Sequence, residues 1–171
     1  KIKRFGVNTH NLSNMKKIST GFYEDLSLLM IDYNLLQQDR SIIFEECKKN
    51  NIEISAGTSL CQGSLLQSPL ESFLKNRNFF YLLRFILKKS SKKYLSPAKI
   101  YRKFAKSNYP KEYKTIPLSF ILNNSSIKTI PMGMLSKSSI DKNINIAKNT
   151  TPTELTEKIG KWCLLNCQIS D

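Results

Sequence analysis

The chain has 171 residues, 40% of them hydrophobic, which is enough for one domain with its own core. It contains no apolar run of about 18 residues, and no apolar stretch follows its basic amino terminus, so we expect neither a membrane span nor a signal peptide. The formal net charge of +14 raises the question of an anionic partner.

Four apolar segments end in glycine or small polar residues and predict strands. They are residues 3–8, 27–32, 52–57 and 127–131. Helix patterns lie between the first three strands, over about residues 12–26 and residues 39–49. In the second helix Ile42, Ile43, Phe44 and Cys47 are predicted to form an apolar face. Alternating strands and helices predict an α/β fold with a parallel sheet or barrel.

Residues 64–115 are predicted to be a long, basic and mostly helical segment with a break at Asn108-Tyr109-Pro110. The stretch 70–115 holds 13 of the 27 basic residues, including Lys92, Lys93, Lys99, Arg102, Lys103 and Lys106. This charge could serve nucleic acid, an anionic membrane surface or a phosphorylated substrate. We favour helices with one buried apolar face and one solvated lysine face, in a chain whose Lys, Ile and Asn content indicates a coding bias. No nucleic-acid partner is therefore expected.

The segment Thr129–Asn143 has the pattern of a phosphate-binding turn. An apolar run enters a turn at Gly133, where backbone can approach a ligand closely, and the hydroxyl residues Ser136, Ser138 and Ser139 follow. A helix starting there points free N–H groups at an anion. The same pattern is equally typical of a capped helix in any α/β protein. The last predicted helix has Thr151 as N-cap and runs to about Cys167.

The cysteines and the single histidine do not form a recognisable metal site. Cys163 and Cys167 are four residues apart on a predicted helix, but neither zinc-ligand spacing nor a second histidine accompanies them. We therefore expect no metal. Free, buried thiols in a reducing cytoplasm are predicted for Cys47, Cys61, Cys163 and Cys167.

Taken in order, these segments resemble the aldo/keto reductase family. KIKRFGVNTHN resembles the family's fifth barrel strand, IDYNLLQQD the sixth and NIEISAGTSLCQGSLL the seventh. SIKTIPMGMLSKSSIDKNINIA resembles the eighth strand and its following helix, and PLSFILNNSSI resembles the helix before it. The resemblance covers most of residues 1–148. It implies the carboxy-terminal half of a (β/α)₈ TIM barrel, strands five to eight, which is an open half-barrel as an isolated chain. Residues 64–115 would be an insertion after the seventh strand.

The resemblance also implies what the chain lacks, because a complete barrel needs about 250 residues. The family's catalytic Asp, Tyr, Lys and His lie on the first four strands, so no catalytic residue is expected here. His10, the only histidine, follows the fifth-strand motif, and Tyr33 matches a position that the family uses structurally. The implied partners are an amino-terminal half-barrel and, in the complete protein, a small-molecule carbonyl substrate.

The cofactor implied by the resemblance is NADP, with NAD possible. Asn8 and Thr9 match positions that hold the nicotinamide carboxamide, or alternatively they only cap the next turn. The other implied contacts are Leu60, Gln62 and Gly63 on the pyrophosphate, Gly133, Met134 and Ser136 on the adenosine phosphate, and Asn143 near the adenine. Ser139 stands where the family often has an arginine for the 2′-phosphate, and Lys137 could supply that charge instead. Met30 and Gly57 replace a carboxamide-binding glutamine and a stacking aromatic ring.

Three functions follow as alternatives. The first is the cofactor-binding half of an NAD(P)H-dependent carbonyl reductase, inactive without its partner half. The second is a non-catalytic, barrel-derived binding module whose basic surface contacts an anionic partner. The third is a truncated product without independent activity. An upstream segment that carries the four catalytic residues at strand ends would favour the first.

Overall fold

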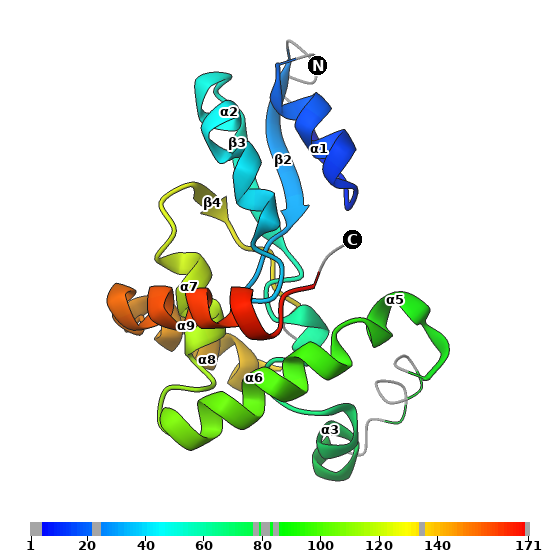
Figure 1. Ribbon diagram of the computed structural model, residues 1–171, viewed down its shortest axis with the longest axis vertical. Helices are drawn as coiled ribbons and strands as arrows, with labels where there is room; N and C mark the ends of the chain where they lie inside the picture. The colour runs from blue at the N-terminus through cyan, green and yellow to red at the C-terminus, as the bar shows by residue number, and fades with distance from the viewer. Residues whose placement is uncertain are drawn as a thin grey trace.

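The computed structural model describes residues 5–21, 25–76, 79, 83, 86–133 and 136–169. Its centre is a sheet of four parallel strands that neighbour each other in chain order (Figure 1). The strands are β1 (Phe5–Asn8), β2 (Leu26–Asp32), β3 (Glu53–Gly57) and β4 (Ile127–Thr129). All four coincide with predicted strands where the structure describes them. The prediction of an α/β fold with a parallel sheet is therefore confirmed.

One face of the sheet is apolar and carries the first core. Alternate residues of neighbouring strands, Leu29 and Ile31 of β2 with Ile54 and Ala56 of β3, are buried together. The helices α1 (Leu12–Ser19) and α2 (Phe44–Lys49) contribute Met15, Ile18, Phe44 and Cys47 to this core. A strand buried under helices needs this run of apolar residues, which is why the strand prediction succeeded.

Two helix predictions need correction. The first helix ends at Ser19 instead of residue 26, because Gly21 adopts a left-handed conformation with φ 77 and turns the chain toward β2. The second begins as the 3₁₀ helix η1 (Asp39–Ile43) and continues as α2. Ile42 does not share the apolar face, since 63% of it is exposed.

The basic segment contributes a second core. It contains α3 (Pro69–Asn76), α5 (Lys89–Lys92) and α6 (Leu95–Asn108), which lie on the side toward which the β2 arrowhead points in Figure 1. Ala98, Tyr101 and Ala105 form the buried stripe of α6. This stripe packs with the loop after β2, the 3₁₀ helix η2 (Cys61–Gly63) and the last helix α9 (Thr153–Asn166). The predicted break holds, because α6 ends at Asn108.

The opposite side of this segment is a lysine face. Of the basic residues named from the sequence on α5, on α6 and between them, five are exposed: Lys92, Lys93, Lys99, Lys103 and Lys106. Arg102, which the sequence placed with them, is only 8% exposed and donates a hydrogen bond to the carbonyl oxygen of Ser64. Arg102 therefore fastens α6 to the chain after η2 and does not belong to the solvated charge.

The remaining helices are α7 (Ile116–Leu122), α8 (Lys137–Lys148) and α9. Helix α7 contacts both α8 and α9, and Gly160 of α9 is required there, since a Cβ would lie 2.7 Å from the Phe120 ring. Pro152 occupies the N-cap of α9 one residue later than predicted. Thr151 instead shares a hydrogen bond of 2.9 Å with the hydroxyl of Thr115.

The thiols behave as predicted, because all four cysteines are free and buried. Burial and the neighbouring Glu46 raise the pKa of Cys47 to about 11, which keeps that thiol protonated near neutral pH. Within the described ranges, no helix combines the length and apolar character that crossing a membrane requires. Those ranges also contain no group of three metal-ligating side chains.

Candidate functional site

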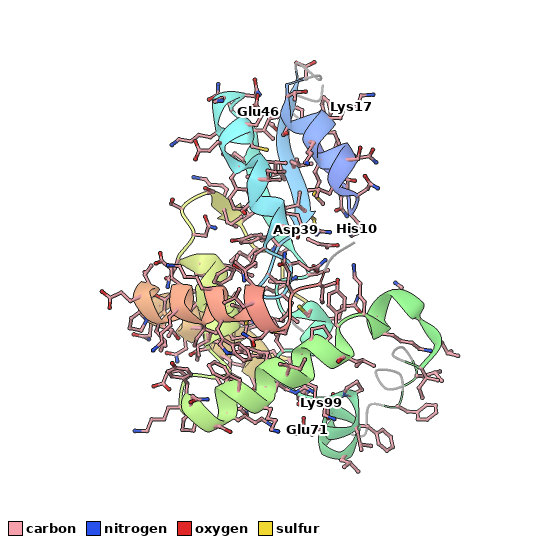
Figure 2. The ribbon with its side chains drawn as sticks, viewed as in Figure 1. His10, Lys17, Asp39, Glu46, Glu71 and Lys99 are labelled. Carbon is pink, nitrogen blue, oxygen red and sulfur yellow. The ribbon has the colours of Figure 1, made fainter. Side chains whose placement is uncertain are left out.

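The carboxyl ends of parallel strands meet at one edge of a sheet, and the predicted site residues follow these ends. In the strand register Asn8 of β1 lies beside Met30 of β2, and Asp32 of β2 lies beside Gly57 of β3. Three groups therefore line the carboxyl edge: residues 8–10 at the end of β1, residues 58–63 after β3, and residues 130–133 and 136–143 after β4. Figure 2 shows His10, of the first group, at the end of α1 that lies nearest the β2 arrowhead.

In the first group the side chain of Asn8 is exposed, whereas the hydroxyl of Thr9 takes part in a hydrogen bond. Asn8 is exposed at the strand end. Thr9 donates its backbone N–H to the Met30 carbonyl at 3.2 Å, and its hydroxyl oxygen accepts the N–H of Asn11 at 3.3 Å. Thr9 thus supports the turn into α1, as the structural alternative expected, while the Asn8 amide faces solvent and can take a ligand.

The two departures from the family pattern are neighbours in space. A Cβ added to Gly57 would lie 2.9 Å from Cε of Met30 and 3.3 Å from the backbone oxygen of Ile31. The methionine therefore occupies the space that a side chain at position 57 would need. Met30 and Gly57, which stand where the resemblance implied a glutamine and an aromatic ring, therefore pack against each other.

The second group is a strained turn. Thr58, Cys61 and Gln62 have positive φ angles of 48, 48 and 57, which side-chain-bearing residues rarely adopt. Gly63, at φ 88, donates its N–H to the Leu60 carbonyl at 2.9 Å. The side-chain oxygen of Gln62 accepts a hydrogen bond of 2.7 Å from Ser91 of α5. The turn that the sequence assigned to the pyrophosphate is thus tied to the basic segment.

The third group is the turn into α8. Ser136 is its N-cap, and its hydroxyl oxygen accepts the N–H of Ser139 at 3.2 Å. Lys137 is exposed in the first turn and Asn143 is half-buried further along. Among the described residues other than its chain neighbours, no atom lies within 4 Å of a Cβ added to Gly133, and its backbone is not left-handed. The turn therefore does not require glycine at position 133, contrary to the expectation. The space beside Gly133 is open to a ligand. Met134 lies outside the described residues.

A hydrogen-bonded chain that the sequence did not predict crosses the same edge. Nδ1 of His10 lies 2.7 Å from Oδ2 of Asp32, and Thr58 donates to Oδ1 of Asp32 at 2.9 Å. The buried Tyr94 lies near Thr58, and burial raises the pKa of the Tyr94 hydroxyl. One sequence feature could have indicated this contact. His10 comes shortly after one predicted strand and Asp32 ends the next, so parallel pairing places both side chains at one edge.

Tyr33 has the structural role that the family resemblance implied. Its hydroxyl accepts a hydrogen bond of 3.1 Å from Asn124, and its ring stacks on Phe120 at 5.8 Å. Burial raises the pKa of Tyr33, which disfavours proton donation from it. Tyr33 and α9 border a depression of about 470 Å³, which none of the predicted cofactor residues lines.

Comparisons with known proteins agree with this fold. A sequence model of the aldo/keto reductase family matches residues 1–161. The holo form of aldo-keto reductase AKR11C1 from Bacillus halodurans superposes with a TM-score of 0.67 at 14% identity, over 95% of this chain and 50% of its own. The glycerol dehydrogenase AKR11B4 from Gluconobacter oxydans has a TM-score of 0.59 at 18% identity, over 100% and 52%. No curated protein sequence matches the chain.

The chain thus spans about half the length of these two solved structures. The family inferred from four ordered strand ends is also the family whose model matches nearly the whole sequence. The chain therefore belongs to the aldo/keto reductase family.

Proposed function

We propose that this chain is the carboxy-terminal, cofactor-binding half of an NAD(P)H-dependent carbonyl reductase, corresponding to strands five to eight of a (β/α)₈ barrel. The observation that carries the proposal is a chain with four parallel strands in chain order, which superposes on about half of each of two solved structures. The free, buried thiols fit a reducing compartment, and we propose the cytoplasm.

The edges of the sheet support a partner half-barrel. β1 and β4 are its outer strands in the described part of the chain, and Phe5 of β1 is 40% exposed. Helix α8, which follows β4, has no buried residue, and Ile140 and Ile144 on it are 39% and 48% exposed. An amino-terminal half-barrel, in the same polypeptide or another, would cover these groups and supply the catalytic Asp, Tyr, Lys and His.

The residues at the carboxyl edge fit a nicotinamide dinucleotide. The cofactor supplies a hydride when bound, and the protein contributes binding and orientation. Asn8 presents an exposed amide for the carboxamide, and Leu60, Gln62 and Gly63 would border the pyrophosphate. The open space at Gly133 and the capped start of α8 would take the adenosine phosphates, with Asn143 near the adenine. Lys137 would meet the 2′-phosphate that distinguishes NADP from NAD.

Fluorescence titration of this chain with NADPH and NADH tests the proposal. In Lys137→Glu we expect NADPH affinity to fall roughly tenfold, because a charge-assisted contact is replaced by repulsion. NADH affinity should stay nearly unchanged. Lys142→Glu, an exposed lysine on the same helix, is the matched control. Equal losses for both cofactors would remove Lys137 from the 2′-phosphate.

A second variant separates the turn from the charge. Gly133→Val should weaken NADPH and NADH equally, because its side chain fills space that is open in the protein and would be occupied by ligand. Its stability should match wild type. If the chain binds neither cofactor, the cofactor-binding proposal fails, and the lysine face on α5 and α6 becomes the better candidate, as an anion-binding module. That alternative is weaker because α6 is part of the core and Lys106 already pairs with Glu71 at 3.3 Å.

A further inference from the structure

The hydrogen-bonded chain at the carboxyl edge runs from the second core to solvent. At its inner end Thr58, which lies near the 2% exposed Tyr94, donates to Asp32 at 2.9 Å. At its outer end Asp32, itself 4% exposed, faces Nδ1 of His10 at 2.7 Å. The imidazole is 69% exposed, so a buried carboxylate holds a solvent-facing histidine.

The donor pattern fixes which ring nitrogen carries the proton. An ionised carboxylate only accepts hydrogen bonds, and both Asp32 oxygens are used, one by Thr58 and one by His10. In neutral His10 the proton therefore resides on Nδ1, and Nε2 carries a lone pair. Nε2 has no hydrogen-bond partner among the described residues. This is the arrangement by which a buried aspartate orients a histidine base in hydrolases.

The backbone of Thr58 adopts a conformation that is unfavourable for a residue with a side chain. A β-branched residue rarely adopts a φ of 48, so the backbone at Thr58 is strained. In this conformation the Thr58 hydroxyl lies near Asp32 and Tyr94. Tyr94 precedes α6, so the start of α6 lies near this edge of the sheet.

We propose that His10 is a proton-accepting group of the ligand site, whose Nε2 receives a hydrogen bond from a hydroxyl of the bound ligand. The hydroxyl belongs either to the ribose of a nucleotide or to an alcohol, and both present the same donor to Nε2. The exposed Asn8, two residues away, offers an amide beside it. The ligand contact rests on the proposed binding site, whereas the orientation of His10 rests on the His10–Asp32 and Thr58–Asp32 hydrogen bonds alone.

His10 is the only histidine in the chain, so its tautomer can be measured without assignment ambiguity. A long-range proton–nitrogen NMR spectrum in alkaline buffer should show the Nδ1–H form. Asp32→Asn should shift the population toward the Nε2–H form, because an amide can donate to Nδ1. Asp32→Glu is the conservative variant and should restore the Nδ1–H form. Finding wild-type His10 as the Nε2–H form would overturn the proposal.

Acylation by diethyl pyrocarbonate then measures the reactivity of Nε2. Asp32→Asn should lower the rate roughly threefold, because the Nε2–H form that it favours has no lone pair on Nε2 for acylation. Thr58→Val, which removes one bond to Asp32, should give a smaller decrease and serves if Asp32→Asn does not fold by circular dichroism. Equal rates in wild type and the folded variants would contradict the claim that Asp32 keeps a lone pair on Nε2 of His10.

Protection experiments identify the source of the hydroxyl. Protection of His10 from acylation by NADPH would assign the ribose of a nucleotide, and protection by glycerol would assign an alcohol. His10→Gln, which cannot be acylated at this position, gives the background rate for both. Protection by neither compound at saturating concentration would overturn the ligand contact.

Discussion

At the residue scale, side chains at the carboxyl edge are arranged in contacting pairs. Met30 fills the space over Gly57, and these are the two positions at which the resemblance implied a glutamine and an aromatic ring. His10 and Asp32 form a second contacting pair, joined across the ends of β1 and β2 at 2.7 Å. The effect of a substitution in one member of a pair therefore depends on the other member.

Gly57→Ala should destabilise the fold by about 1 kcal/mol through overpacking. The new Cβ would contact Met30 Cε at 2.9 Å and the Ile31 carbonyl, and the flexible methionine can relieve only the first contact. The cost should be smaller in a Met30→Ala background. Urea unfolding of the single and double variants measures this. Gly133→Ala, whose Cβ meets nothing within 4 Å, is the matched control, and an equal loss there would exclude the steric explanation.

At the element scale, helix starts were predictable where a local side chain caps them. Ser136 caps α8 as its sequence pattern indicates, and Asn11 caps α1 through the N–H of Asn14 at 3.0 Å. Helix ends and faces were less predictable. The early end of α1 depends on the left-handed Gly21, and the burial of Arg102 depends on the Ser64 carbonyl, 38 residues earlier in the chain.

A capping box at the start of α3 provides a test at this scale. The Ser68 N–H donates to Glu71 at 2.6 Å, and the Glu71 N–H donates to the Ser68 hydroxyl at 3.1 Å. The Ser68 backbone hydrogen bond lowers the pKa of Glu71, which Lys106 lowers further. A carboxyl group with a lowered folded-state pKa stabilises the protein above its unfolded-state pKa, and this stabilisation is lost as pH falls through the folded-state value.

Glu71→Ala should therefore be less stable than wild type at neutral pH, and the difference should shrink as the pH is lowered to about 3, below the ordinary pKa of glutamate. Urea midpoints of both proteins, measured across this range, provide the comparison. Glu154→Ala, an exposed acid in the first turn of α9 without a capping-box partner in the described part of the chain, is the control. A difference that stays constant with pH would show that the carboxylate is not responsible.

At the scale of the whole molecule, strand order and family were predictable because they depend on repeated local patterns. Four apolar segments with polar ends suffice for a parallel sheet, whatever surrounds it. The second core was not predictable, since Tyr101 of α6 meets Cys163 of α9 only after the chain has folded. The hydrogen-bonded chain from Thr58 through Asp32 to His10 has the same origin, because its members come from three separate segments.

The outer strands and α8 lead to the last prediction, that the isolated chain associates. Exposed apolar residues beside unpaired strand edges favour pairing with another chain. At tens of micromolar we expect poor solubility, or dimers that complete a barrel, by sedimentation velocity. The double variant Ile140→Lys and Ile144→Lys should shift the chain toward monomer, because it places charge on the uncovered helix. Leu165→Lys, at an 86% exposed position on α9, should leave association unchanged, because α9 already packs on α6 and α7. Monodisperse wild-type monomer with cooperative unfolding would show that this half is self-sufficient, and the proposed partner half-barrel would then be unnecessary for the fold.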